Sequence, residues 1–138
     1  MSQVFLAYSQ QDEREAAEIR NELANFGLDV WWDAELPPGK SWAHEVSKAL
    51  DRSDSMIALV SPRSMASDLV RRELDHAITH DNFCRRVFPV IIAHTPAVPA
   101  YFSLLEVFDI TKNRTQGLRD VVKAIKAAEE RATAETAQ

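Results

Sequence analysis

The stretch that decides the fold is Val4-Phe5-Leu6-Ala7-Tyr8-Ser9, an apolar run that ends in a polar loop. A continuously apolar strand is typical of a parallel sheet, because helices cover both of its faces. About sixty residues later, a predicted helix carries Arg71-Arg72-Glu73-Leu74. Open sheets of this class bind ligands beyond the carboxyl ends of their strands, so the two stretches predict a site at that edge.

Four further runs predict strands. Residues 56–60 and 87–93 are continuously apolar, whereas residues 28–32 and 107–110 alternate, which is typical of less buried edge strands. Pro89 cannot donate a hydrogen bond, so it is expected near a strand start or at a gap in the pairing. Residues 95–105 show no period and predict a loop with at most one helical turn.

Apolar residues at spacings of three and four predict four helices between these strands. In chain order they are Ala16, Ile19, Leu23 and Phe26; Val46, Ala49 and Leu50; Val70, Leu74, Ala77 and Ile78; and Leu118, Val121, Val122 and Ile125. Gly27 is the expected C-cap of the first helix, and Ser41 and Ser67 are expected before the second and third. The alternation predicts one α/β domain over residues 1–126 with a doubly wound parallel sheet, and a fraying tail over residues 127–138.

Composition and motifs exclude several classes of protein. The net charge of −5 disfavours nucleic acid and anionic membranes as partners, and no membrane-length apolar stretch occurs, so we expect a cytoplasmic protein or a secreted effector. The single Cys84 excludes a disulfide framework. The three glycines, at positions 27, 39 and 117, cannot form a Rossmann or P-loop motif. Ser61-Pro62 stands where a phospho-accepting receiver domain needs an aspartate.

Glu73 is the candidate functional residue on the third helix. A helical wheel places it at the border of the apolar stripe. Periodicity alone favours a solvated glutamate, while the alternative is a partly desolvated carboxylate that faces the cleft above the sheet. Glu73, His76 and His80 also share one side of the helix, but their spacing matches no known metal motif, so no metal site is predicted.

Residues 33–40, Asp33-Ala34-Glu35-Leu36-Pro37-Pro38-Gly39-Lys40, form an unusually long connection between the second strand and the second helix. Two prolines stiffen it, so we expect a defined projecting loop. Trp31, Trp32 and Trp42 flank it, and the adjacent pair should face opposite sides of the sheet. A role in ligand or protein contact and a role in core filling stay equally open for these rings.

With these motifs in order, the chain resembles a TIR (Toll/interleukin-1 receptor) domain of the bacterial kind from Val4 to about Lys126. Residues 4–12 are similar to the first family motif, residues 33–39 to the projecting loop, and residues 59–74 to the third strand and catalytic helix. The resemblance implies a flavodoxin-like sheet of five parallel strands in the order 2-1-3-4-5, with helices on both faces. It also implies a self-associating enzyme of immunity or signalling that cleaves NAD+ between nicotinamide and ribose, by hydrolysis or cyclisation.

The resemblance further assigns roles to individual residues. Glu73 would be the catalytic carboxylate, and NAD+ would be the substrate, with no separate cofactor. The residues expected to bind the substrate are Tyr8 and Ser9 beside the nicotinamide, Asp33 and Trp42 at the opening, and Leu69, where relatives often carry a stacking tryptophan. The residues expected at a homotypic TIR interface are Leu36, Pro37, Pro38 and Gly39.

The alternative is a non-catalytic module that contacts other TIR domains, as an adaptor or as an effector that disrupts host signalling. Glu73 would then be a helix charge only, and the leucine at position 69 favours this alternative. Nucleic-acid hydrolysis or cyclic-nucleotide synthesis, known in some relatives, lacks support from the acidic composition. The sequence does not indicate the product form, the activating trigger or the downstream effector.

Overall fold

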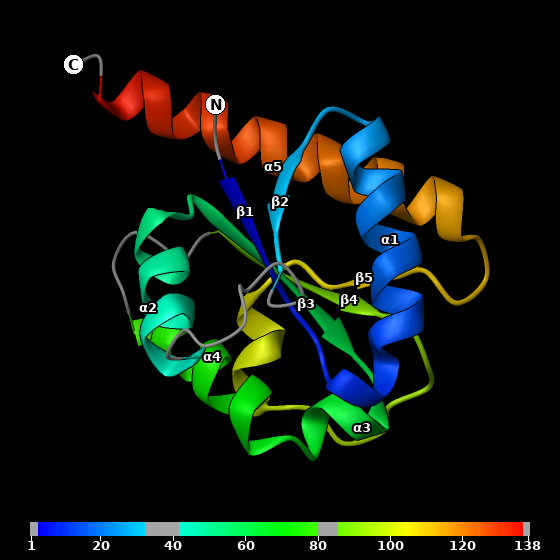
Figure 1. Cartoon of the computed structure of the whole chain (residues 1–138). Coiled ribbons are helices and arrows are strands. Elements are labelled where there is room, and N and C mark those ends of the chain that lie inside the picture. Colours follow the sequence, from blue (N-terminus) through cyan, green and yellow to red (C-terminus); the bar gives the residue numbers. More distant parts are fainter. Residues whose placement is uncertain (1–2, 33–41, 80–85, 137–138) are drawn as a thin grey trace.

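The computed structural model describes residues 3–32, 42–79 and 86–136, with the backbone only for residues 42, 43 and 132–136. The strands in these ranges are β1 (Gln3–Ala7), β2 (Asp29–Trp31), β3 (Ser55–Val60), β4 (Val87–Ile91) and β5 (Phe108–Asp109) (Figure 1). The helices are η1 (Gln10–Asp12), α1 (Glu13–Asn25), α2 (Trp42–Arg52), α3 (Pro62–Met65), α4 (Asp68–Thr79), η3 (Ala100–Leu104) and α5 (Arg114–Thr136).

The five strands form one parallel sheet in the order β2-β1-β3-β4-β5. This order confirms the predicted flavodoxin-like fold, with the two alternating strands at the edges. Pro89 lies in the middle of β4, level with Ala58 of β3. The Arg86 carbonyl and the Ile92 amide hydrogen-bond to β3, whereas the Ile91 carbonyl accepts from Ile110 just after β5. Because alternate residues of a strand bond to opposite neighbours, the backbone of Pro89 faces β5. Because β5 pairs only from Val90 onward, the missing N–H of Pro89 falls at a gap in the pairing, as predicted.

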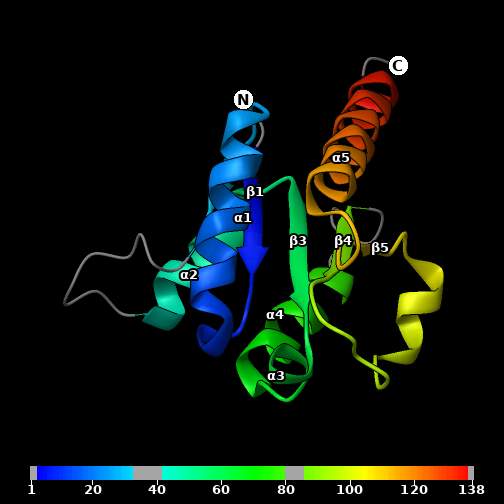
Figure 2. The same cartoon turned by 90° about the vertical axis from the view of Figure 1, so that its right-hand side faces the viewer.

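Alternate residues along β1 belong to two separate hydrophobic cores. Val4, Leu6 and Tyr8 pack with α1 and α5, whereas Phe5 and Ala7 pack with α2 and α4. Figure 1 shows the sheet between these two pairs of helices, and Figure 2 looks onto the side that α1 and α5 cover. A parallel strand covered on both faces has no polar side, which explains why its sequence is continuously apolar.

The helix ends confirm two of the predicted caps. The Ser67 hydroxyl oxygen accepts from the Val70 amide at the start of α4, whereas Ser41 lies outside the described residues. Gly27 has a φ of 91° after α1, a backbone conformation that favours glycine at a helix C-cap. Residues 100–104 form the single helical turn expected in the β4–β5 connection. The last helix differs, because α5 continues to Thr136 instead of fraying from residue 127, and Ala128 is buried. Alanine, glutamate and arginine are good helix formers and favour the helix in this segment. The predicted domain boundary at residue 126 stays a prediction. In the described ranges, no helix is long and apolar enough to cross a membrane.

The carboxyl ends of β1 and β3 are joined through the buried carboxylate of Asp12, whose side chain has no exposed surface. Its Oδ2 accepts a hydrogen bond from the Ser61 hydroxyl at 2.6 Å, and its Oδ1 accepts one from Arg63 Nε at 2.6 Å. The Ser61 hydroxyl oxygen in turn accepts from the Ser64 amide and caps α3. A single carboxylate therefore fixes η1 against α3, which lie together in Figure 1.

The short helix α3 is absent from the sequence predictions, although its signal is readable. Ser61 is the N-cap, Pro62 occupies the start of the helix, and the Ser64 hydroxyl accepts from the Ser61 amide at 2.8 Å. This is a capping box with serine in place of the usual glutamate or glutamine. A helix of only four residues is too short to produce the periodic apolar pattern on which the other predictions rest.

We predict that Gly117→Ala destabilises the protein, although alanine is the better helix former by about 1 kcal/mol. α5 passes so close to Ile110 that a Cβ at position 117 would lie 3.0 Å from the Ile110 Cβ. The overlap is expected to lower the free energy of unfolding by about 1–2 kcal/mol, measured by urea denaturation. Thr115→Ala, at an exposed position of the same helix, is the control and should leave stability unchanged or slightly raised. Increased stability of Gly117→Ala would contradict this close packing.

We predict that Asp12→Ala lowers the free energy of unfolding by about 2 kcal/mol, because it removes the acceptor of two charge-assisted hydrogen bonds. The neighbouring Glu13→Ala removes an exposed carboxylate and should change stability by less than about 0.5 kcal/mol. Chemical denaturation of both variants measures the difference. Equal stability of the two variants would show that Asp12 does not hold η1 and α3 together.

Candidate functional site

Helix α4 supplies the central residue of the candidate site. It packs on the face of the sheet that α2 also covers, and it contacts β1 and β3. Val70, Leu74 and Ala77 are fully buried against the sheet, which confirms three of the predicted inward positions. Ile78 is half-buried at the edge of the same core. The side of α4 that borders this apolar stripe therefore lies against the protein, and the opposite side faces water.

Glu73 is buried, with 8% of its surface exposed. The solvated glutamate that periodicity favoured is therefore wrong for this position. Arg72 and Asp75, its polar neighbours on α4, are exposed and follow the usual pattern for charged helix residues. Burial of a carboxylate is costly unless other groups compensate it, and buried carboxylates with such compensation concentrate at functional sites. Glu73 thus has the environment expected of a functional acid or of an ion-pair partner.

Ser9 is also buried, with 7% of its surface exposed, at the end of β1. Its hydroxyl oxygen accepts a hydrogen bond from the Gln11 amide at 3.3 Å and caps η1. Ser9 lines an open pocket of about 550 Å³ together with residues of η1, α3 and the α3–α4 connection; they are Gln10, Gln11, Pro62, Arg63, Ala66 and Ser67. The carboxyl edge of the sheet therefore carries the hollow that the topology predicted.

Tyr8 lies on the other side of the sheet. Its side chain is 5% exposed within the core formed with α1 and α5, and its ring lies 5.9 Å from that of Trp32. Consecutive residues of an extended chain point to opposite faces, so Tyr8 and Ser9 separate although they adjoin in sequence. The structure does not place the Tyr8 ring on the α4 side of the sheet, where Glu73 lies.

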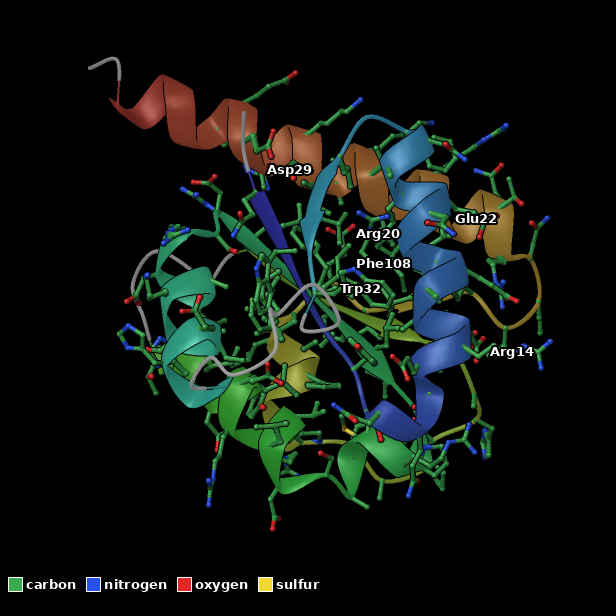
Figure 3. All side chains as sticks on the ribbon, viewed as in Figure 1. Arg14, Arg20, Glu22, Asp29, Trp32 and Phe108 are labelled. Atoms are coloured by element: carbon green, nitrogen blue, oxygen red, sulfur yellow. The ribbon has the colours of Figure 1, made fainter. Side chains whose placement is uncertain are left out.

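The adjacent tryptophans divide between the faces as expected. The Trp31 ring stacks on Phe5 at 5.2 Å on the α2–α4 face, whereas Trp32 packs on the α1–α5 face. The Arg20 guanidinium lies 5.9 Å from the centre of the Trp32 ring, and Figure 3 shows both residues between α1 and β2. Both rings are half-buried, so they fill the margins of the two cores.

The remaining predicted site residues are only partly described. Leu69 is half-buried on α4, one turn before Glu73. Trp42 begins α2, but its side chain lies outside the described residues. Asp33 and the predicted interface residues lie wholly outside the described residues; the latter are Leu36, Pro37, Pro38 and Gly39. The expectations for these positions stay predictions.

Tyr101 of η3 adds a phenol beside α4. Its ring packs at the edge of the α2–α4 core, and its buried hydroxyl has no hydrogen-bond partner among the described residues. Burial raises the pKa of this phenol, and the nearby Asp75 carboxylate raises it further, while Arg71 lowers it. The group therefore stays neutral and is a hydrogen-bond donor at physiological pH.

Metal ligands do not gather in the parts of the chain that the structure describes, where no group of three such side chains could hold an ion. His76 of α4 instead lies 4.0 Å from Asp51 of α2, measured from Nε2 to Oδ1. His80 lies outside the described ranges.

Sequence reasoning missed Asp12 and Arg63 as builders of this site. Arg63 lines the pocket, and its position depends on the buried Asp12 carboxylate. The sequence shows Asp12 just after β1 and Arg63 just after β3, where a parallel sheet brings loops together. Their pairing across 51 residues has no periodic signal, so only the strand order could have suggested it.

Comparisons with known proteins agree with this fold. A search of curated proteins finds no match. The TIR domain of the Toll-related receptor TRR-2 from Hydra magnipapillata is similar, with a TM-score of 0.76 and 18% identity, over 89% of this chain and 97% of that one. A TIR-STING receptor from C. gigas, in complex with 2′,3′-cGAMP, gives a TM-score of 0.74 and 20% identity over 88% of this chain and 38% of the receptor.

The TIR domains of the activated Roq1 resistosome, which recognises the pathogen effector XopQ, are also similar. They give a TM-score of 0.58 and 22% identity, over 94% of this chain and 84% of that one. At such low identities the three structures establish the shared fold alone. The family itself follows from the sequence, because the family model described as TIR domain matches residues 4–122. With the strand order and this match in agreement, the chain belongs to the TIR domain family.

Proposed function

We propose that this TIR domain cleaves NAD+ between nicotinamide and ribose, with Glu73 as the catalytic carboxylate. The observation that carries the proposal is the burial of Glu73 on the apolar side of α4, with 8% of its surface exposed. A solvated helix glutamate would need no explanation, whereas a desolvated one is a candidate functional group.

The chemistry of the bond suits a single carboxylate. The nicotinamide ring of NAD+ is already cationic and leaves as a neutral molecule, so its departure needs no acid. Positive charge develops instead on the ribose, and a fixed carboxylate in a poorly solvated site stabilises that charge strongly. Glycoside hydrolases use carboxylates in the same way at oxocarbenium-like centres. Water would then give ADP-ribose, and attack from within the adenine moiety would give a cyclic product.

Ser9 is the second residue that we place in the NAD+ site. It lies at the end of β1, which α4 contacts, and it lines the pocket of about 550 Å³. Its hydroxyl could donate a hydrogen bond to an oxygen of NAD+. Tyr8 is left out of the proposed site, because its ring is buried among apolar side chains on the other face of the sheet. Asp33, Trp42 and Leu69 stay in the proposal as residues that line the opening.

We further propose that activity depends on association with other TIR domains, in immunity or signalling. The chain has no glycine-rich motif to hold the dinucleotide, so a neighbouring copy would complete the site. The Roq1 TIR domains occur in an activated resistosome, and this supports an assembled state as the active one. Residues 36–39 would contribute to the contact between copies.

A non-catalytic module for TIR–TIR contacts is the second candidate function. The observation in its favour is the exposure of Leu104 on η3, which is 84% exposed, with Val98 and Val107 also exposed nearby in the sequence. Large exposed apolar side chains that gather on a surface often mark protein interfaces. This candidate requires association of the chain and no turnover of NAD+.

We predict that Glu73→Gln lowers the rate of nicotinamide release at least about 100-fold, because it removes the charge and leaves the shape of the side chain nearly unchanged. Asp75→Asn, an exposed carboxylate on the same helix, is the matched control and should retain wild-type activity. Chromatography of reactions with NAD+ at high protein concentration measures the release, and circular dichroism verifies the fold of each variant.

Wild-type activity of folded Glu73→Gln would exclude Glu73 as the catalytic residue. A wild-type protein that associates in sedimentation experiments but releases no nicotinamide would instead support the contact module.

We predict that Leu69→Trp lowers the KM for NAD+ about fivefold. Position 69 lies one turn before Glu73, and an indole there would stack on the nicotinamide ring, a contact worth about 1 kcal/mol. The matched control is Leu69→Met, which keeps a flexible apolar side chain without a ring. An unchanged or higher KM for Leu69→Trp, with kcat unaffected, would show that this position does not contact the nicotinamide.

A further inference from the structure

We propose that the pocket between η1 and α3 is a subsite for a diphosphate group, with Arg63 as its anchor. The pocket has a volume of about 550 Å³ and lies at the carboxyl ends of β1 and β3. The assignment of this diphosphate to a dinucleotide rests on the proposed function, whereas the anion site itself does not.

Arg63 is held in a defined position by one end of its guanidinium. Nε donates to the buried Asp12 carboxylate at 2.6 Å, and 52% of the Arg63 side chain is exposed. Both Nη groups make no hydrogen bond to the described residues, so their N–H donors remain for a ligand. A planar guanidinium with a fixed edge is a preorganised bidentate donor for phosphate oxygens.

The charge around the pocket selects an anion. Arg63 is the only charged side chain among the described residues that line it, although the chain as a whole carries a net charge of −5. The Asp12 carboxylate lies beneath Arg63 with no exposed surface. The pair therefore acts as a dipole that presents its positive end to the pocket, and a cation would find no carboxylate there to bind it.

The other polar groups of the pocket can donate hydrogen bonds. The Ser9 hydroxyl oxygen accepts from the Gln11 amide, and the Ser67 hydroxyl oxygen accepts from the Val70 amide. Each hydroxyl therefore keeps its own hydrogen for a ligand oxygen. The side-chain amides of Gln10 and Gln11 are exposed at the rim and add N–H donors. A diphosphate, rich in acceptors and without donors, fits this set of groups.

The position of the pocket relative to Glu73 suits the diphosphate of NAD+. Ser67 lines the pocket just before α4, and Glu73 follows six residues later in α4. At about 1.5 Å of rise per residue, the two positions lie about 9 Å apart along the helix axis. In NAD+, one ribose and its 5′ carbon separate the scissile bond from the diphosphate, which is a comparable span. The nicotinamide end can thus lie near Glu73 while the diphosphate binds Arg63.

Titration of the 15N-labelled full chain with inorganic pyrophosphate tests this proposal by NMR. Saturable shifts are expected at the amides of residues 9–11 and 63–67. Arg63→Gln should weaken binding at least tenfold, because it removes a charge-assisted bidentate contact. Arg14→Gln is the matched control, since Arg14 points outward from α1 and lines a neighbouring pocket but not this one (Figure 3). It should leave binding unchanged.

Two further ligands test whether the diphosphate bound at this site belongs to a dinucleotide. ADP-ribose should bind at the same residues and compete with pyrophosphate, whereas ribose 5-phosphate should bind more weakly, because it carries a single phosphate. Pyrophosphate binding without any binding of ADP-ribose would overturn the assignment to a dinucleotide. Shifts that do not saturate, or equal affinities of Arg63→Gln and wild type, would overturn the anion site itself.

The shift map of the wild-type chain decides the question even if Arg63→Gln fails to fold, because shifts located elsewhere would overturn the site. These measurements need no NAD+ turnover. Loss of the proposed catalytic role of Glu73 and loss of the anion site therefore remain distinguishable outcomes.

Discussion

The hydrogen bonds of the buried Asp12 carboxylate are the interaction on which the pocket edge of this domain depends. The carboxylate accepts hydrogen bonds from Ser61 and Arg63 and so joins the chain after β1 to the chain after β3. Parallel strands bring these segments to the same edge, but they do not fix the loops against each other. The carboxylate does so partly through Arg63, which lines the pocket together with Ser9. A buried acceptor with two donors is costly to disrupt, which makes it an effective anchor for loops.

Burial of a carboxylate also makes Glu73 the candidate functional residue of this domain. The apolar stripe of α4 packs against β1 and β3, and Glu73 lies buried at its border. Among the described residues, the carboxylates of Asp12 and Glu73 are both withdrawn from water. Asp12 accepts hydrogen bonds from the Arg63 guanidinium and the Ser61 hydroxyl and so holds η1 against α3. In the proposed role of Glu73, its desolvated carboxylate stabilises the positive charge that develops on the ribose.

Particular residues show how far the sequence predicts this molecule. Continuous and alternating apolar runs predicted the strands and their places in the sheet, because burial on one or two faces directly determines such patterns. The helical wheel placed Glu73 at the border of the apolar stripe. It could not predict that this side chain is buried, because burial depends on what packs beside α4. Strand alternation separates Tyr8 from Ser9, yet the family resemblance grouped them. The contact between Asp12 and Arg63 follows from strand order and not from local sequence.

The most direct test of the central claim is the specific rate of nicotinamide release from NAD+, measured against protein concentration together with the associated fraction from sedimentation. An assembly-dependent enzyme predicts that the rate per chain rises with the associated fraction and that folded Glu73→Gln associates equally but releases almost no nicotinamide. Association of the wild-type chain without nicotinamide release at any concentration, or equal release by both proteins, would contradict the proposed function.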